Sequence, residues 1–262
     1  KDLHFDAPMP ETQALMKALE HARPHLVYSL HNAGFGGVYY YLSHDLKDVY
    51  ETFYEIPKTR GLALSLGEAE MPWAVTFAPA VYKTSSITEA YDHLERYGSE
   101  PPATLIRGGG SSYDFLGPRG DPLMLIAELP YFQSPGVADE TPVGATRREV
   151  ILAGVENSLE LVGNLNDLLT RAAPEMTLDT RFYRAVRSFA VGMAQGIESK
   201  RAWAETAAGM DAPATVAQET DALYVGPFYE LLIASMLRRA LDLQLAETPS
   251  GTSRGRETFF DG

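Results

Sequence analysis

The chain has 262 residues, of which 45% are hydrophobic and 22% charged, an ordinary composition for one large or two small globular domains. Its formal net charge of −13 argues against a nucleic-acid backbone or an anionic membrane surface as the main partner. No cysteine is present, which excludes disulfides, thiolate catalysis and cysteine-ligated metals, so any metal must be held by His, Asp or Glu.

The first half of the chain alternates between helical and extended patterns. Residues 61–82 follow no clear pattern, and 107–122 are predicted to form a loop. Ser86 and Glu89 have the spacing of a capping box at the start of a helix. In chain order we predict a helix over 10–22, a strand over 25–30 followed by a glycine-rich turn, a strand over 38–43, helices over 45–56 and 86–97, and a strand over 123–130 that Pro130 ends. This alternation predicts an α/β architecture.

The second half, which follows the Pro-, Gly- and acid-rich residues 134–144, is predicted to be helical. Apolar stripes with helical spacing run over 151–169 and 178–197, and a third helix covers 214–246 with a kink at Pro227. We interpret these stripes as packing faces and not as a cofactor site. The predicted division is an α/β domain over 1–135, a helical extension over 136–246 and a polar tail over 247–262.

Two polar residues are the main candidates for chemistry. The sequence has no P-loop, dinucleotide fingerprint or nucleophile elbow, and none of its six histidines has an acidic residue three positions later. His31 follows one apolar strand, and Glu128 lies near the end of another. Because ligands of open α/β sheets bind at the carboxyl ends of strands, the two side chains could converge on one cleft. A water activated by zinc, with Glu128 as its general base, would give the buried carboxylate a partner.

Each of these features also has a structural interpretation. A single histidine at the end of a strand can be a hydrogen-bonded structural residue, and a glutamate just before Pro130 can be an edge or ion-pair residue. The glycine- and serine-rich residues 107–112 can form a flexible loop instead of a substrate clamp.

Three stretches together resemble the C-terminal half of a zinc carboxypeptidase domain. They are "PETQALMKALEHARPHLVYSLH" (10–31), "GGGSSYDFL" (108–116) and "MLIAELP" (124–130). That family has a Pro-Glu-led helix running into a strand that ends in a zinc-ligand histidine, then a Gly-Ser segment ending in an aspartate, then a strand bearing the catalytic glutamate. The resemblance implies that residues 1–135 are the C-terminal half of a catalytic domain, with a partial mixed sheet and flanking helices.

The resemblance also implies roles for individual residues. His31 would ligate Zn²⁺ as a neutral imidazole, and Glu128 would take a proton from the attacking water and pass it to the leaving amine. The remaining implied positions bind substrate: Ser111, Ser112, Tyr113 and Asp114 would line the pocket for its terminal side chain, Asn32 follows the ligand histidine, and Arg107 would substitute as an anion binder.

The family's other two zinc ligands come from an upstream HxxE motif, which this chain lacks. Because catalytic zinc needs three protein ligands, we expect competence only with an N-terminal segment or partner chain that carries HxxE. The expected function is a zinc-dependent metallopeptidase that hydrolyses a peptide or amide bond. The alternatives are a non-catalytic binding or scaffold module of the same fold, and a zinc deacylase of small N-acyl amino acids.

The remaining expectations concern partners and location. The expected partners are a peptide or amide substrate and the HxxE-bearing segment, with neither nucleic acid nor membrane, and the helical extension could mediate oligomer formation. No apolar run approaches the roughly 20 residues of a spanning helix. We therefore expect a cytoplasmic protein, with secretion left open because the chain begins at Lys1 and not at Met.

Overall fold

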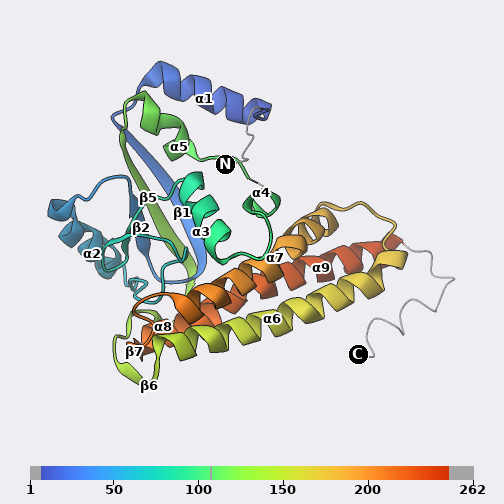
Figure 1. Cartoon of the computed structure of the whole chain (residues 1–262). Helices are drawn as coiled ribbons and strands as arrows, with labels where there is room; N and C mark the ends of the chain where they lie inside the picture. The colour runs from blue at the N-terminus through green and yellow to red at the C-terminus, as the bar shows by residue number, and fades with distance from the viewer. Residues whose placement is uncertain (1–6, 107, 248–262) are drawn as a thin grey trace.

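The computed structural model describes residues 7–106 and 108–247 and shows a five-stranded mixed sheet with helices, followed by a helical region (Figure 1). The strand order is β1-β5-β2-β4-β3. The strands are β1 (Leu26–Gly36), β2 (Tyr39–Leu42), β3 (Thr76–Ala78), β4 (Val81–Lys83) and β5 (Leu123–Gln133). The predicted α/β architecture is therefore confirmed, with its mixed sheet in the first half of the chain.

The pairing of β1 with β5 sets the geometry of the sheet. The two strands are parallel, while β2 runs antiparallel to β5 on its other side. Both long strands are longer than predicted: β1 continues through the expected glycine turn to Gly36, and β5 continues past Pro130 to Gln133. Gly34, at a φ of +67°, pairs with Pro130 at a register shift. The backbone hydrogen-bond ladder is already interrupted at this register shift. Pro130, which has no N–H, can therefore lie there without ending the strand.

Five helices accompany the sheet: α1 (Pro10–Ala22), α2 (Tyr50–Thr59), α3 (Ile87–Tyr97), α4 (Pro102–Leu105) and α5 (Ser112–Leu116). The bounds of α1 match the prediction, and α3 begins with the predicted Ser86–Glu89 capping box. By contrast, α2 starts later than predicted and runs past Pro57. Pro57 has no N–H to donate to the carbonyl of Phe53, four residues earlier in the helix. That carbonyl instead accepts a hydrogen bond of 3.0 Å from the Tyr40 hydroxyl. The predicted loop over 107–122 contains α5.

Apolar side chains cover both faces of the sheet. On the face under α2, the buried cluster includes Val38, Leu42 and Val81, with Leu123 and Leu125 packed against it. On the opposite face, buried Tyr39, Tyr41 and Tyr82 pack against partly buried residues of the segment 64–74. Residues 61–82, which carried no sequence pattern, therefore form much of the cover over this second face.

The helical region packs three long helices together, and its first strand pairs with a strand that follows the second of these helices. Its elements are β6 (Pro142–Thr146), α6 (Arg147–Ala172), α7 (Arg181–Thr206), β7 (Pro213–Thr215), α8 (Val216–Thr220) and α9 (Gly226–Glu247). The predicted third helix is divided into α8 and α9 by a π-helical turn at Asp221–Val225, directly before Pro227. Figure 1 shows α1 and α5 at the end of the sheet where β1 and β5 begin, and the long helices across the other end.

The apolar stripes of the predicted helices pack together in part: Leu165, Val186, Ile233 and Leu237 form one buried cluster between α6, α7 and α9. Phe189 and Leu232, which also belong to the predicted stripes, are 53% and 39% exposed. Among residues 7–106 and 108–247, no helix is both long and apolar enough to cross a membrane. The predicted polar tail lies outside the described residues, apart from its first position, Glu247.

Candidate active site

The site is built on the two parallel strands, which place His31 and Glu128 directly opposite each other in register. Paired residues of adjacent strands project to the same face of a sheet, so the two side chains meet. His31 Nδ1 lies 3.0 Å from Glu128 Oε1. The His31 side chain is 50% exposed and that of Glu128 only 10%, so the imidazole covers a nearly buried carboxylate.

The opposite flank of Glu128 carries two tyrosines and a second carboxylate. Tyr39 of β2 pairs in register with Glu128, and Tyr41 lies two positions further along the same face. Glu70 Oε2 accepts hydrogen bonds of 3.1 Å from both phenol groups. Burial, and then the charge of Glu70, raises the pKa of Tyr39 and of Tyr41, so both remain protonated donors. The tyrosines thus hold Glu70 beside the pair.

These neighbours disfavour the charged form of Glu128. Burial raises the pKa of its carboxyl above the usual range, the charge of Glu70 raises it further, and His31 lowers it in part. A carboxyl with a raised pKa is a stronger proton acceptor in its charged form than an ordinary carboxylate. Such a shift, together with a specific partner, is typical of functional sites.

A cavity of about 270 Å³ adjoins this cluster, between the sheet and the helical region. Tyr39 and Glu70 form one wall, and the π-helical turn contributes Asp221 on the other. Burial raises the pKa of Asp221 to about 7, although the charge of Lys200 opposes the shift. Tyr229 of α9 fixes the helical wall to the sheet, because its hydroxyl donates a 2.9 Å hydrogen bond to the carbonyl of Ala33.

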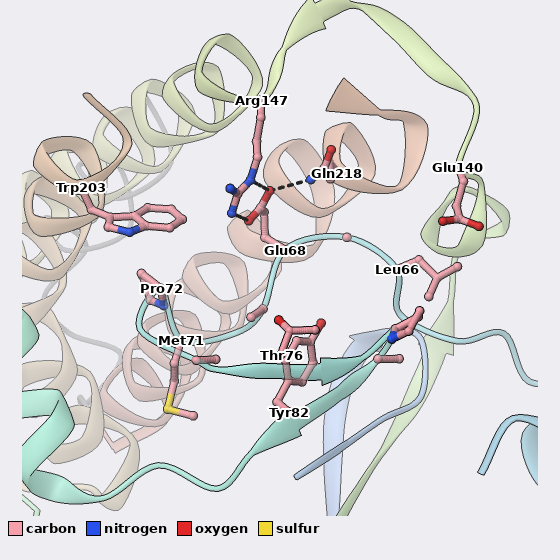
Figure 2. A pocket seen from close by; sticks show the side chains of 15 residues that line it. Leu66, Glu68, Met71, Pro72, Thr76, Tyr82, Glu140, Arg147, Trp203 and Gln218 are labelled. Atoms are coloured by element: carbon pink, nitrogen blue, oxygen red, sulfur yellow. Dashed lines mark hydrogen bonds and ion pairs between the residues drawn. The ribbon is translucent and has the colours of Figure 1, made fainter. Parts of the chain in front are cut away.

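A second cavity, of about 230 Å³, lies on the other side of Glu68 (Figure 2). The Glu68 carboxylate accepts from Arg147 Nε at 2.6 Å and from Arg147 Nη2 at 2.5 Å, and from Gln218 Nε2 at 2.9 Å. Figure 2 shows the Arg147 side chain reaching from the start of α6 toward Glu68. Since both partners of Glu68 belong to the helical region, this ion pair fastens that region to the segment that covers the sheet.

Among the described residues, the structure does not bring the predicted substrate-binding segment 111–114 to the pair. Ser111 and Asp114 form the capping box of α5, and Asp114 Oδ1 accepts a 3.0 Å hydrogen bond from the Ile87 backbone N–H. The segment Ser111, Ser112, Tyr113 and Asp114 comes before the start of β5 at Leu123, and Leu123 itself is about 17 Å along the strand from Glu128. Asn32 is exposed in β1, and Arg107 lies outside the described residues.

Sequence reasoning missed Glu70, Tyr39 and Tyr41. The signal that could have identified Glu70 is the polar "GEAE" (67–70) inside an otherwise apolar stretch. The alternation of Tyr39 and Tyr41 could have placed both hydroxyls on the face of Glu128, but only once the pairing of β2 with β5 was known.

The described residues do not form a complete metal site. No group of three or more His, Asp or Glu side chains within 7–106 and 108–247 could hold a metal ion. Zinc in a catalytic site needs three protein ligands and an open position. His31 and Glu128 therefore do not make a zinc site with their described neighbours alone.

Comparison with protein-family models, with curated proteins and with solved structures finds no match to this chain. Functional conclusions therefore depend on the geometry of the site.

Proposed function

We propose that this chain is the His31- and Glu128-bearing part of a zinc-dependent peptidase of the carboxypeptidase type, which hydrolyses a peptide or amide bond. The observation that carries the proposal is the 3.0 Å contact between His31 Nδ1 and Glu128 Oε1, made by residues in register on parallel strands. Because the described residues hold too few ligands, the proposal assigns the remaining zinc ligands to an HxxE-bearing segment or partner chain.

In this proposal the residues of the chain move a proton and position the reacting groups. Glu128 accepts a proton from the attacking water at its carboxylate and then donates it to the leaving amine, a role favoured by its raised pKa. His31 presents its half-exposed imidazole next to that carboxylate. Zinc, when bound in the complete assembly, would polarise the scissile carbonyl and lower the pKa of water.

Zinc content tests the ligand assignment. In the assembly isolated with its partner segment, elemental analysis should find zinc with the wild-type chain and lose it with His31→Ala. His44→Ala is the matched control, because His44 is also half exposed and bonded to a carboxylate, that of Asp121. Zinc content that does not change with His31→Ala would exclude His31 as a ligand.

Hydrolysis tests the role of Glu128. Glu128→Gln should lower the rate by about 10²–10⁴ while zinc stays bound, since only the proton acceptor is removed. Glu55→Gln is the control, because Glu55 is an exposed glutamate paired only with Lys58. A panel of C-terminal peptides and small N-acyl amino acids would separate a peptidase from a deacylase. Near wild-type rates with Glu128→Gln would contradict the mechanism.

The absence of a complete ligand group in the described residues favours a second candidate, a non-catalytic binding module. An assembly that binds no zinc and cleaves nothing in the panel, but still requires the His31–Glu128 contact for partner binding, would support that candidate.

A further inference from the structure

The second cavity, of about 230 Å³, lies where the segment that covers the sheet meets the helical region (Figure 2). Figure 2 shows Trp203 and Pro72 on one side of it, and Leu66 and Glu140 on the other. Thr76 and Glu140 are exposed lining residues, so the cavity opens to solvent. A protein cavity of about 150 Å³ can hold benzene. This cavity therefore has room for a small organic molecule.

One donor group in the cavity wall has no acceptor. Arg147 uses its Nε and Nη2 atoms for the Glu68 carboxylate. Its Nη1, which carries two of the five guanidinium N–H donors, has no hydrogen-bond acceptor within the part of the chain that the structure describes. The Trp203 ring, whose centroid lies 5.5 Å from Arg147 Cζ, contacts the guanidinium as well. The ion pair and the ring thus hold a free charged donor in a fixed orientation.

Much of the remaining wall is apolar. Leu66, Met71 and Pro72 line the cavity, together with the small side chains of Ala69 and Ala74. Small-molecule sites typically combine such walls with a few polar groups that fix the orientation of the ligand. The wall therefore favours a ligand with a hydrocarbon body and one hydrogen-bond acceptor.

Charge decides which acceptor fits. Three lining side chains are charged, and the two carboxylates of Glu68 and Glu140 against the one guanidinium of Arg147 leave a net charge of −1. An anionic ligand on Arg147 would lie beside the Glu68 carboxylate and be repelled by it. A cationic ligand would find only Glu140, and exposed ion pairs contribute little. An uncharged carbonyl oxygen accepts from the charged donor without either penalty.

We propose that this cavity binds a small uncharged molecule in which a carbonyl group, such as that of a carboxamide, is attached to an apolar body. Arg147 Nη1 donates to the carbonyl oxygen, and the body packs between Leu66 and Pro72. Glu68 neutralises the guanidinium and fixes its plane. The site is separate from the His31–Glu128 pair, and its occupation does not depend on the proposed hydrolysis.

Tryptophan fluorescence tests the head group of the ligand. The chain has two tryptophans, so Trp73→Phe leaves Trp203 as the only reporter. This variant is titrated with hexanamide, hexanoate and hexylammonium, whose six-carbon chains carry a neutral, an anionic and a cationic head group. Hexanamide should change the Trp203 emission with a dissociation constant on the order of 1 mM, and the charged probes should bind about fivefold more weakly or worse. No response to hexanamide, or tighter binding of either charged probe, would overturn the proposal.

A lysine substitution tests the donor. In the Trp73→Phe background, Arg147→Lys keeps a positive charge beside Glu68 but removes the planar fork. It should weaken hexanamide binding by about fivefold or more. Arg148→Lys is the matched control, because the Arg148 side chain is 27% exposed against 26% for Arg147, is also paired with a carboxylate and does not line the cavity. Equal effects of the two variants would exclude Arg147 as the donor.

A larger side chain tests the space without touching the ion pair. Ala74→Leu, in the same background, adds three carbon atoms at the wall and should weaken hexanamide binding by about tenfold or more. Ala14→Leu is its control, because Ala14 is exposed on α1, at the other end of the sheet (Figure 1). Circular dichroism checks that all variants remain folded. Hexanamide binding that is unchanged by Ala74→Leu would place the probe outside this cavity and overturn the proposal.

Discussion

Two nearly buried carboxylates, one on β5 inside the sheet and one at the junction with the helical region, have opposite surroundings. The side chains of Glu128 and Glu68 are 10% and 7% exposed. Glu68 receives two hydrogen bonds from the permanently charged Arg147 and a third from Gln218. Glu128 contacts an imidazole, and the charge of Glu70 raises its pKa.

The difference separates a carboxylate held in a fixed ion pair from one suited to the proposed proton transfer. A bidentate guanidinium satisfies the charge of Glu68 in a fixed geometry, so this residue is suited to fastening two regions together. The charge of Glu128 is compensated less completely, which leaves the residue able to exchange a proton. Burial alone therefore does not distinguish the two carboxylates, whereas the nature of their partners does.

The largest expected effect comes from removing the cation at the junction. Arg147→Met should lower the free energy of unfolding by about 3 kcal/mol, because it leaves the Glu68 charge nearly buried and unpaired. Urea denaturation measures this change. Arg184→Met is the control and should cost less than about 1 kcal/mol, since the Arg184–Asp179 pair is exposed. A loss as small as that of the control would mean that Glu68 is not a fastener.

An intermediate effect is expected at Asp221, which lies between the two sites. Its folded pKa of about 7 exceeds the ordinary value of 3.8, so its contribution to stability is present below about pH 4 and is lost as pH rises through 7. Asp221→Asn should therefore be more stable than wild type at pH 8, by on the order of 2 kcal/mol, with no gain at pH 4. Denaturation at both pH values measures the difference, and a gain of equal size at both would contradict it.

The smallest effect on stability is expected at the proposed reactive residue. Because the folded pKa of Glu128 is raised, the stabilising contribution of its carboxyl is lost as pH rises through that pKa. Glu128→Gln cannot titrate, so the free energy of unfolding should depend less on pH. At pH 8 it should change by about 1 kcal/mol or less. Glu68→Gln should instead destabilise the protein by about 2 kcal/mol, because it removes the partner of Arg147. If the two variants were equally destabilising in urea, the contrast between the sites would disappear.

The local patterns of the sequence predicted the elements that local interactions specify. The capping box at Ser86 and the proline-led start of α1 fix helix ends through groups only a few residues apart. His31 and Glu128 could be predicted as neighbours because both occupy apolar strands of an α/β fold, and the parallel pairing brings them together. The glycine turn and the end of β5 at Pro130 were predicted wrongly, because both depend on the register between distant strands.

The sequence by itself determined the α/β class, the helical second half and the two residues of the central pair. Tertiary structure alone decided which groups surround that pair and which carboxylate is neutralised. Arg147 and Gln218 reach Glu68 across separations of 79 and 150 residues, and Glu70 meets Tyr39 across 31. Periodicity encodes which face of an element is apolar, but the partners of a buried charge depend on how separate elements pack.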